Sequence, residues 1–103
     1  MENQNPEHQL NIELSEEIAE GIYSNLAIIT HSPTEFVVDF IKVMPGVPKA
    51  RVKSRIVLTP QHAKRLLHAL SDNIQKFEQQ NGKIKEMEVN ALPLSFGGPT
   101  AQA

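Results

Sequence analysis

Four basic side chains alternate along one segment of this chain of 103 residues. Lys49, Arg51, Lys53 and Arg55 occupy every second position, and small or apolar residues lie between them. Side chains of a β-strand point alternately to its two faces, so a strand here predicts four positive groups on one face. Such a row of cations suits phosphate oxygens or the acidic surface of a protein. The pattern predicts binding, although lysine on an edge strand also serves simply to prevent aggregation.

The sequence favours no catalytic chemistry. His8, His31, His62 and His68 are scattered, and the six-residue separation of the last two does not aim both at one metal ion. There is no cysteine, which excludes a disulfide framework and a thiolate metal site. No glycine-rich phosphate loop or nucleophile elbow occurs. We therefore predict that the protein is not an enzyme and uses no metal or cofactor.

Composition indicates one small domain. No apolar run approaches the roughly 18 residues of a membrane helix, and residues 1–7 are polar and acidic, unlike a signal peptide. These features predict a cytoplasmic protein that does not bind membranes.

The net charge of −2 conceals an asymmetry, because residues 1–20 contain six acids and no lysine or arginine, whereas residues 21–80 contain eight bases and four acids. The acidic arm either pairs with a basic body, its own or a neighbour's, or keeps the protein soluble.

Hydrophobic alternation predicts several strands before the helix. The expected strands are residues 8–14, 22–30, 34–44 and 49–58, and residues 15–21 form a loop or a single helical turn. Proline and glycine at Pro45 and Gly46 predict a type II turn between the last two strands. Within that hairpin we predict that Asp39 lies opposite Arg55, with Ile41 opposite Lys53, Val38 opposite Ile56 and Phe36 opposite Leu58, since this register gathers apolar side chains on one face.

A long amphipathic helix is predicted over residues 60–80. Thr59 is a good N-cap, Pro60 fits the first helical position, and Asn81-Gly82 ends the helix. Its apolar residues form one stripe: Ala63, Leu66, Leu67, Leu70, Ile74 and Phe77. The predicted fold is α+β, an antiparallel sheet of three to four strands packed by this C-terminal helix. We expect a single domain over residues 8–84, a disordered N-terminus over 1–7 and a flexible tail over 85–103, where Met87 to Leu94 form at most one short element.

One helix cannot cover both faces of a sheet, and this predicts an interface. A helix of about 30 Å also exceeds the width of a small sheet, so its far end near Phe77 is expected to pack on a second subunit. The apolar residues proposed for the interface are Tyr23, Ile29, Val37, Ile41, Val57 and Phe77. We therefore predict a homo-oligomer, a dimer or higher.

Short motifs give the chain a resemblance to a known family. They are Ser32-Pro33-Thr34-Glu35-Phe36, Asp39-Phe40, Pro45-Gly46 and Thr59-Pro60-Gln61-His62-Ala63-Lys64. Over residues 9–84 the sequence resembles the bacterial family catalogued as domain of unknown function 3467, which implies an identity but no established activity. The order of strands and helix is also similar to the SecB export chaperone, which implies the capture of unfolded chains. The family's association with a gene position beside RNA polymerase subunits implies a partner in transcription.

The sequence thus predicts a non-catalytic interaction domain that associates with itself and binds protein. Three alternatives remain open at this stage: a SecB-like holding chaperone, an accessory factor of the transcription machinery, and nucleic-acid binding through residues 49–55.

Overall fold

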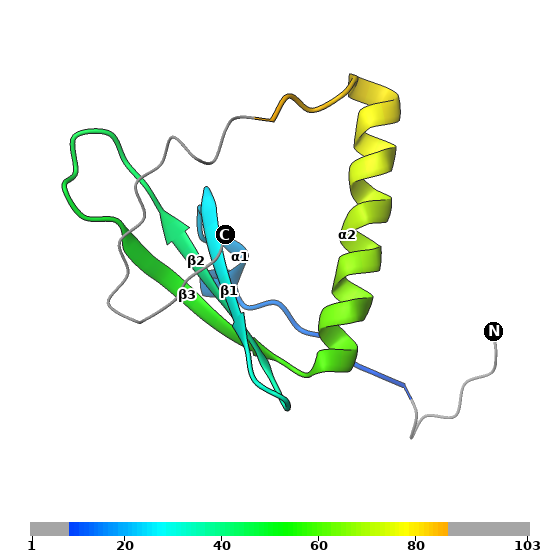
Figure 1. The fold of residues 1–103 in the computed structure, drawn as a ribbon. Helices are drawn as coiled ribbons and strands as arrows, with labels where there is room; N and C mark the ends of the chain where they lie inside the picture. Colours follow the sequence, from blue (N-terminus) through cyan, green and yellow to red (C-terminus); the bar gives the residue numbers. More distant parts are fainter. Residues whose placement is uncertain (1–8, 87–103) are drawn as a thin grey trace.

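The computed structural model describes residues 9–86 and has an α+β arrangement (Figure 1). The element order is α1 (Glu16–Ala19), β1 (Leu26–His31), β2 (Phe36–Lys42), β3 (Arg51–Leu58) and α2 (Pro60–Asn81). The three strands form one antiparallel sheet in the order β1-β2-β3. The predicted fold class, an antiparallel sheet followed by a long helix, is confirmed.

The segment before β1 differs from the prediction. Residues 9–15 form no strand, and the alternating side chains of Leu10, Ile12 and Leu14 are exposed. The single helical turn that was the alternative for residues 15–21 is present as α1, where the Ser15 hydroxyl accepts a hydrogen bond from the Ile18 N–H. An alternating pattern creates a strand only where a neighbouring strand pairs with it, and within the described residues the sheet ends at β1.

The β2–β3 hairpin has the predicted charge register over most of its length. Asp39 lies opposite Arg55, Val38 opposite Ile56 and Phe36 opposite Leu58. The predicted turn is also present, since residues 45 and 46 form a turn in which Gly46 has φ 79°. An L-residue with a side chain rarely adopts that positive φ, so glycine determines where the chain reverses.

A β-bulge corrects the remaining part of the register. Ile41 lies opposite Val52, not opposite Lys53 as predicted, because the register shifts between Phe40 and Ile41. Lys53 is the extra residue on β3, and beyond a bulge the alternation of side chains is reversed relative to the partner strand. The shift decides where the basic side chains lie.

The core of the described chain is small. Ile28, Val38 and Ile41 are the buried apolar residues among residues 9–86, and Asp39 is buried with them. All four lie on β1 and β2, so β2 is shielded mainly because a strand flanks it on each side.

Helix α2 begins and ends as predicted. The Thr59 side chain accepts a hydrogen bond from the His62 N–H at 3.1 Å, Pro60 is the first residue of the helix, and Gly82 ends it with φ 87°. Each feature acts within one helical turn, which explains why a local pattern predicted both ends.

The cap at Thr59 gives a first prediction. Thr59→Ala removes the acceptor of the His62 N–H and is expected to lower the free energy of unfolding by about 1 kcal/mol. Ser71→Ala, at an exposed position inside α2, is a matched hydroxyl deletion that we expect to change it by less than about 0.5 kcal/mol. Urea denaturation followed by circular dichroism measures both. Equal effects would show that the cap does not stabilise this helix.

Helix α2 does not cover the sheet. It leaves the end of β3 and diverges from the strands (Figure 1), and none of its residues is buried. The expectation that the sheet is packed by this helix is therefore not met by a single chain. Both elements keep their apolar side chains available for other contacts.

Candidate interaction surface

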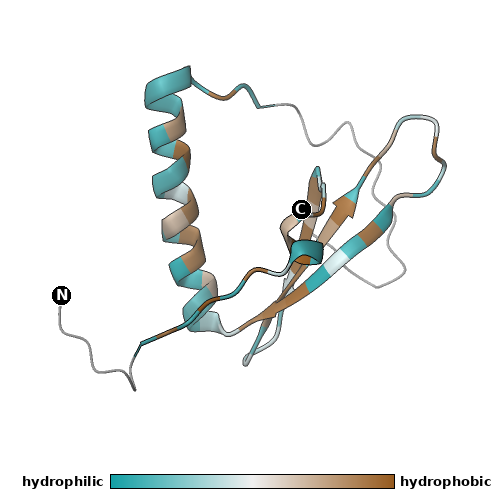
Figure 2. Ribbon diagram, turned by 180° about the vertical axis from the view of Figure 1, so that it is seen from behind, coloured by the Kyte–Doolittle hydropathy of each residue, from teal (hydrophilic) through white to brown (hydrophobic). Residues whose placement is uncertain are grey.

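The apolar stripe of α2 is exposed along its length. Its large residues are all more than a third accessible: Leu66, Leu67, Leu70, Ile74 and Phe77, with values from 39% for Ile74 to 61% for Leu67. Figure 2 shows these residues as a broken brown band on an otherwise hydrophilic helix. Burying a large aliphatic or aromatic side chain stabilises a protein by about 1.5–3 kcal/mol, so a helix face left in this state favours association.

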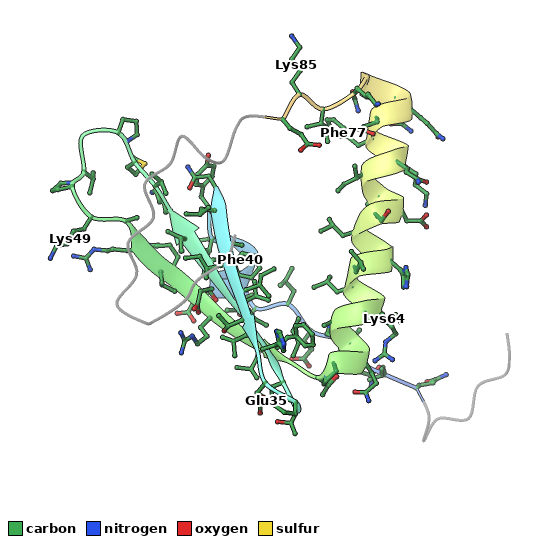
Figure 3. All side chains as sticks on the ribbon, in the orientation of Figure 1. Glu35, Phe40, Lys49, Lys64, Phe77 and Lys85 are labelled. Carbon is green, nitrogen blue, oxygen red and sulfur yellow. The ribbon has the colours of Figure 1, made fainter. Side chains whose placement is uncertain are left out.

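The stripe widens into a hollow at the C-terminal end of α2. Asn73, Ile74, Phe77 and Ile84 line this open, largely apolar depression of about 420 Å³. The chain turns back there because the Glu78 carboxylate accepts a hydrogen bond from the Ile84 N–H at 3.0 Å. Figure 3 shows Phe77 near this end of the helix and Lys64 near its other end.

The predicted interface residues do not form one surface. Val37 and Val57 lie opposite each other and share a face, but Ile29 lies opposite Val38 and belongs to the other face. Ile41 is 4% accessible and cannot contact a partner without rearrangement. Of the six predicted residues, the four that are clearly exposed are Tyr23, Ile29, Val57 and Phe77.

The basic residues do not form one stripe either. Lys49 lies in the bend before β3, and Arg51 lies opposite Lys42 on the face that faces away from Arg55. The bulge at Lys53 causes this division, since it reverses the alternation between Ser54 and Val52. The residues that the spacing placed on one face are therefore spread over two faces and a loop, although all four are exposed.

Arg55 is engaged within the chain. Its Nε donates to Asp39 Oδ1 at 2.6 Å and its Nη2 to Oδ2 at 2.9 Å. The Asp39 side chain is 3% accessible, whereas that of Arg55 is 61% accessible, so the guanidinium covers a buried carboxylate from the solvent side. These hydrogen bonds lower the pKa of Asp39 from its ordinary value despite the opposing effect of burial. The expected partnership of Asp39 with the basic strand is confirmed, while Glu35 forms no ion pair within residues 9–86.

Sequence reasoning missed the role of Ser24 and Asn25. The Asn25 side chain donates to the Val43 carbonyl at 2.9 Å and accepts from the Val43 N–H at 2.8 Å, and the Ser24 hydroxyl donates to the Ile41 carbonyl at 2.9 Å. The amide thus imitates a backbone pairing and extends the β1–β2 ladder past its last regular pair. A short polar pair just before an apolar strand is the signal that could have indicated this role.

Removing the Asn25 amide is expected to weaken the sheet. Asn25→Ala deletes two hydrogen bonds to Val43 and should lower the free energy of unfolding by about 1–2 kcal/mol, since each contributes about 1 kcal/mol. Asn11→Ala, in the exposed segment before α1, is the matched control and should have almost no effect. Urea denaturation compares the two variants, and hydrogen exchange at Val43 reports the local opening.

No group of three or more His, Asp or Glu side chains within residues 9–86 is arranged to hold a metal ion. Of the helices in the same residues, none combines the length and the hydropathy needed to cross a membrane.

The fold and its exposed surfaces define a class of protein, a small α+β domain with a three-stranded antiparallel sheet and an uncovered amphipathic helix. Residues 1–86 match the family described as "Protein of unknown function (DUF3467)", and the chain belongs to this family. The resemblance found in its motifs is therefore confirmed. No curated protein and no solved structure matches the chain.

Proposed function

We propose that this protein is a non-catalytic interaction domain that associates with itself and binds protein through its exposed apolar surfaces. The observation that carries the proposal is the stripe of α2, which is ordered as a helix of 22 residues and yet has no buried residue. Most of the stability of a helix in a protein comes from packing of its apolar face. A second protein surface supplies the packing that residues 9–86 do not supply themselves.

The small core supports the same conclusion. Ordering the backbone costs about 1–2 kcal/mol per residue, and burial of apolar surface is the main term that offsets it. Three buried apolar side chains are few for a sheet and a long helix. Association would bury the α2 residues against the apolar side chains of a second surface, which is the way small domains commonly complete a core.

The experiment measures association first. Sedimentation velocity of the purified full-length protein over a hundredfold range of concentration should show a species larger than a monomer. Cooperative unfolding should then depend on protein concentration, because assembly stabilises the fold by mass action. A monomer that unfolds cooperatively at every concentration would overturn the proposal.

The partner is identified by a pull-down from cell extract with the tagged full-length protein, washed at low and moderate salt with and without nuclease. One defined assembly that survives nuclease, such as RNA polymerase, supports a protein-binding accessory factor. A broad set of unfolded proteins supports a SecB-like holding function. Recovery that nuclease abolishes would replace protein binding with nucleic-acid binding.

A reducing cytoplasm is the compartment we propose, in keeping with the lack of cysteine.

The divided basic residues lead us to expect little affinity for nucleic acid. Arg51 and Lys53 are exposed, but the bulge and the Asp39–Arg55 pair leave no row of cations on one face. Binding of labelled single-stranded and double-stranded DNA should be absent at about 0.15 M salt, and the double variant Arg51→Ala/Lys53→Ala should not differ from the parent. A strong decrease of affinity with salt that the double variant abolishes would contradict this expectation.

A further inference from the structure

We propose that the α2 helices of two copies pack against each other in antiparallel orientation, with Leu70 at the two-fold axis. This inference rests on the self-association proposed above and names the surface that carries it. The observation behind it is a symmetry in the stripe. Counted from Leu70, apolar residues lie at −7, −4, −3, +4 and +7, namely Ala63, Leu66, Leu67, Ile74 and Phe77. The stripe is nearly the same when its direction is reversed, with Asn73 at +3 as the one polar exception.

Helix geometry places all of these residues on one side. At 3.6 residues per turn each lies within about 60° of the direction of Leu70, so they form a single strip on the helix surface. A two-fold interface uses the same patch on both copies. In an antiparallel pair, a residue a given number of positions before Leu70 lies at the level of the residue that many positions after Leu70 in the second copy. A strip that is symmetric about its centre meets this requirement for antiparallel helices.

Side-chain volumes favour the antiparallel orientation. It places Ala63 at the level of Phe77 of the second copy, and Leu66 at the level of Ile74, so that a small residue faces a large one and two branched residues share a layer. A parallel pair in register would place the two alanines together at one end and the two phenylalanines together at the other. Close packing of an interface requires large side chains to meet small ones.

The charges beside the strip are compatible with the antiparallel orientation. Lys64 and Glu78 lie on the same flank of the strip, six residues before and eight residues after Leu70. The antiparallel arrangement brings Glu78 of the second copy within about 3 Å of Lys64 along the helix axis, and the two-fold axis repeats the pair. A parallel pair, in which opposite flanks meet, would instead bring Glu78 beside Lys76 of the second copy, so the choice of orientation rests on the side-chain volumes and not on charge. The other flank brings Lys76 beside His62, which adds no opposite charge.

The hollow at the end of α2 extends the contact area. A helix face about 33 Å long and about 10 Å wide is smaller than the roughly 800 Å² that each partner buries in a standard interface. In the antiparallel pair the hollow lined by Phe77 and Ile84 lies beside the first turn of the other α2 and the end of β3 that leads into it. Ile56 near that end is exposed and adds apolar surface.

Because the chain has no cysteine, single cysteines test the pairing directly. Leu70→Cys should form a covalent dimer on mild oxidation or with a short bismaleimide. Ala63→Cys and Phe77→Cys should each remain monomeric on a denaturing gel, whereas the double variant Ala63→Cys/Phe77→Cys should be linked. His68→Cys, on the polar side of α2, is the control and should not be linked. Circular dichroism checks that each variant retains its helix.

The outcomes separate this inference from the proposed function. Covalent dimers of Leu70→Cys and of the double variant, without links in the other three variants, establish the antiparallel pair. Linked single variants at residues 63 and 77 would show a parallel pair. An oligomer in sedimentation whose Leu70→Cys variant is not linked would overturn the α2 pairing while the self-association stands. A monomeric parent protein would overturn both.

Discussion

Leu70→Glu is expected to dissociate the proposed dimer. The change places two carboxylates at the two-fold axis and removes two leucine side chains, each of which contributes about 1.5–3 kcal/mol when buried. Since about 1.4 kcal/mol is a factor of ten, the dissociation constant should rise at least about 100-fold. Sedimentation velocity at one concentration, chosen where the parent protein is fully associated, measures the change.

A charge-matched control separates the surface from the charge. His68→Glu adds the same negative group on the side of α2 that faces away from the stripe, at a residue that is also exposed. We expect this variant to associate as the parent does. Because Leu70 is 55% accessible in the single chain, Leu70→Glu should not disturb the fold of the separate subunit. Equal association of the two variants would mean that α2 does not form the interface.

Arg55→Met is expected to destabilise the protein at neutral pH and to invert part of its pH dependence. The variant leaves the buried Asp39 carboxylate without the two hydrogen bonds from the guanidinium. A buried polar group left without its partners costs about 1–3 kcal/mol, and a charged group costs more. Lys53→Met removes one positive charge from the same strand without touching Asp39, and should change the free energy of unfolding by less than about 0.5 kcal/mol.

The pH dependence follows from the direction in which the Asp39 pKa moves. In the parent protein the folded-state pKa lies below the ordinary value, so the contribution of Asp39 is complete above about pH 4 and is lost as the pH falls through the folded-state pKa. In Arg55→Met only burial remains, which raises the pKa of Asp39. The variant should therefore lose stability as the pH rises through that raised value.

Urea denaturation of both proteins at pH 4 and at pH 7 tests this argument at a fixed protein concentration. The difference between parent and Arg55→Met should be larger at pH 7 than at pH 4. A difference that is independent of pH would show that Arg55 stabilises the sheet by packing of its aliphatic stem and not through the Asp39 carboxylate.

Local chemistry made several features predictable from the sequence. Thr59, Pro60 and Gly82 act within one turn of α2, and Gly46 sets the hairpin turn through its own backbone angle. The Asp39–Arg55 pairing was predictable because one apolar face and one charged pair exclude a slip by a single residue. The apolar stripe on α2 follows from periodicity alone, whereas its exposure does not.

The same reasoning failed where distant residues decide the structure. Residues 9–15 have an alternating pattern, but in the described chain no strand is available to pair with them. Among the predicted interface residues, Ile41 proved to be buried and Ile29 proved to lie on the face opposite Val37. The pairing of β1 with β2 determines both outcomes, and no short stretch of sequence contains it.

By itself the sequence determined the three strands and α2, the caps of that helix, the hairpin turn, the charged pair and the membership of the family. The caps and the turn depend on steric preferences and on contacts between residues close in the sequence, and the charged pair depends on the register of a single hairpin. Only the tertiary structure decided that a bulge at Lys53 divides the basic residues and that α2 stands away from the sheet. Both features depend on how segments distant in the sequence lie relative to one another, which local preferences do not determine. The uncovered helix is also what turned a general expectation of binding into a defined surface with Leu70 at its centre.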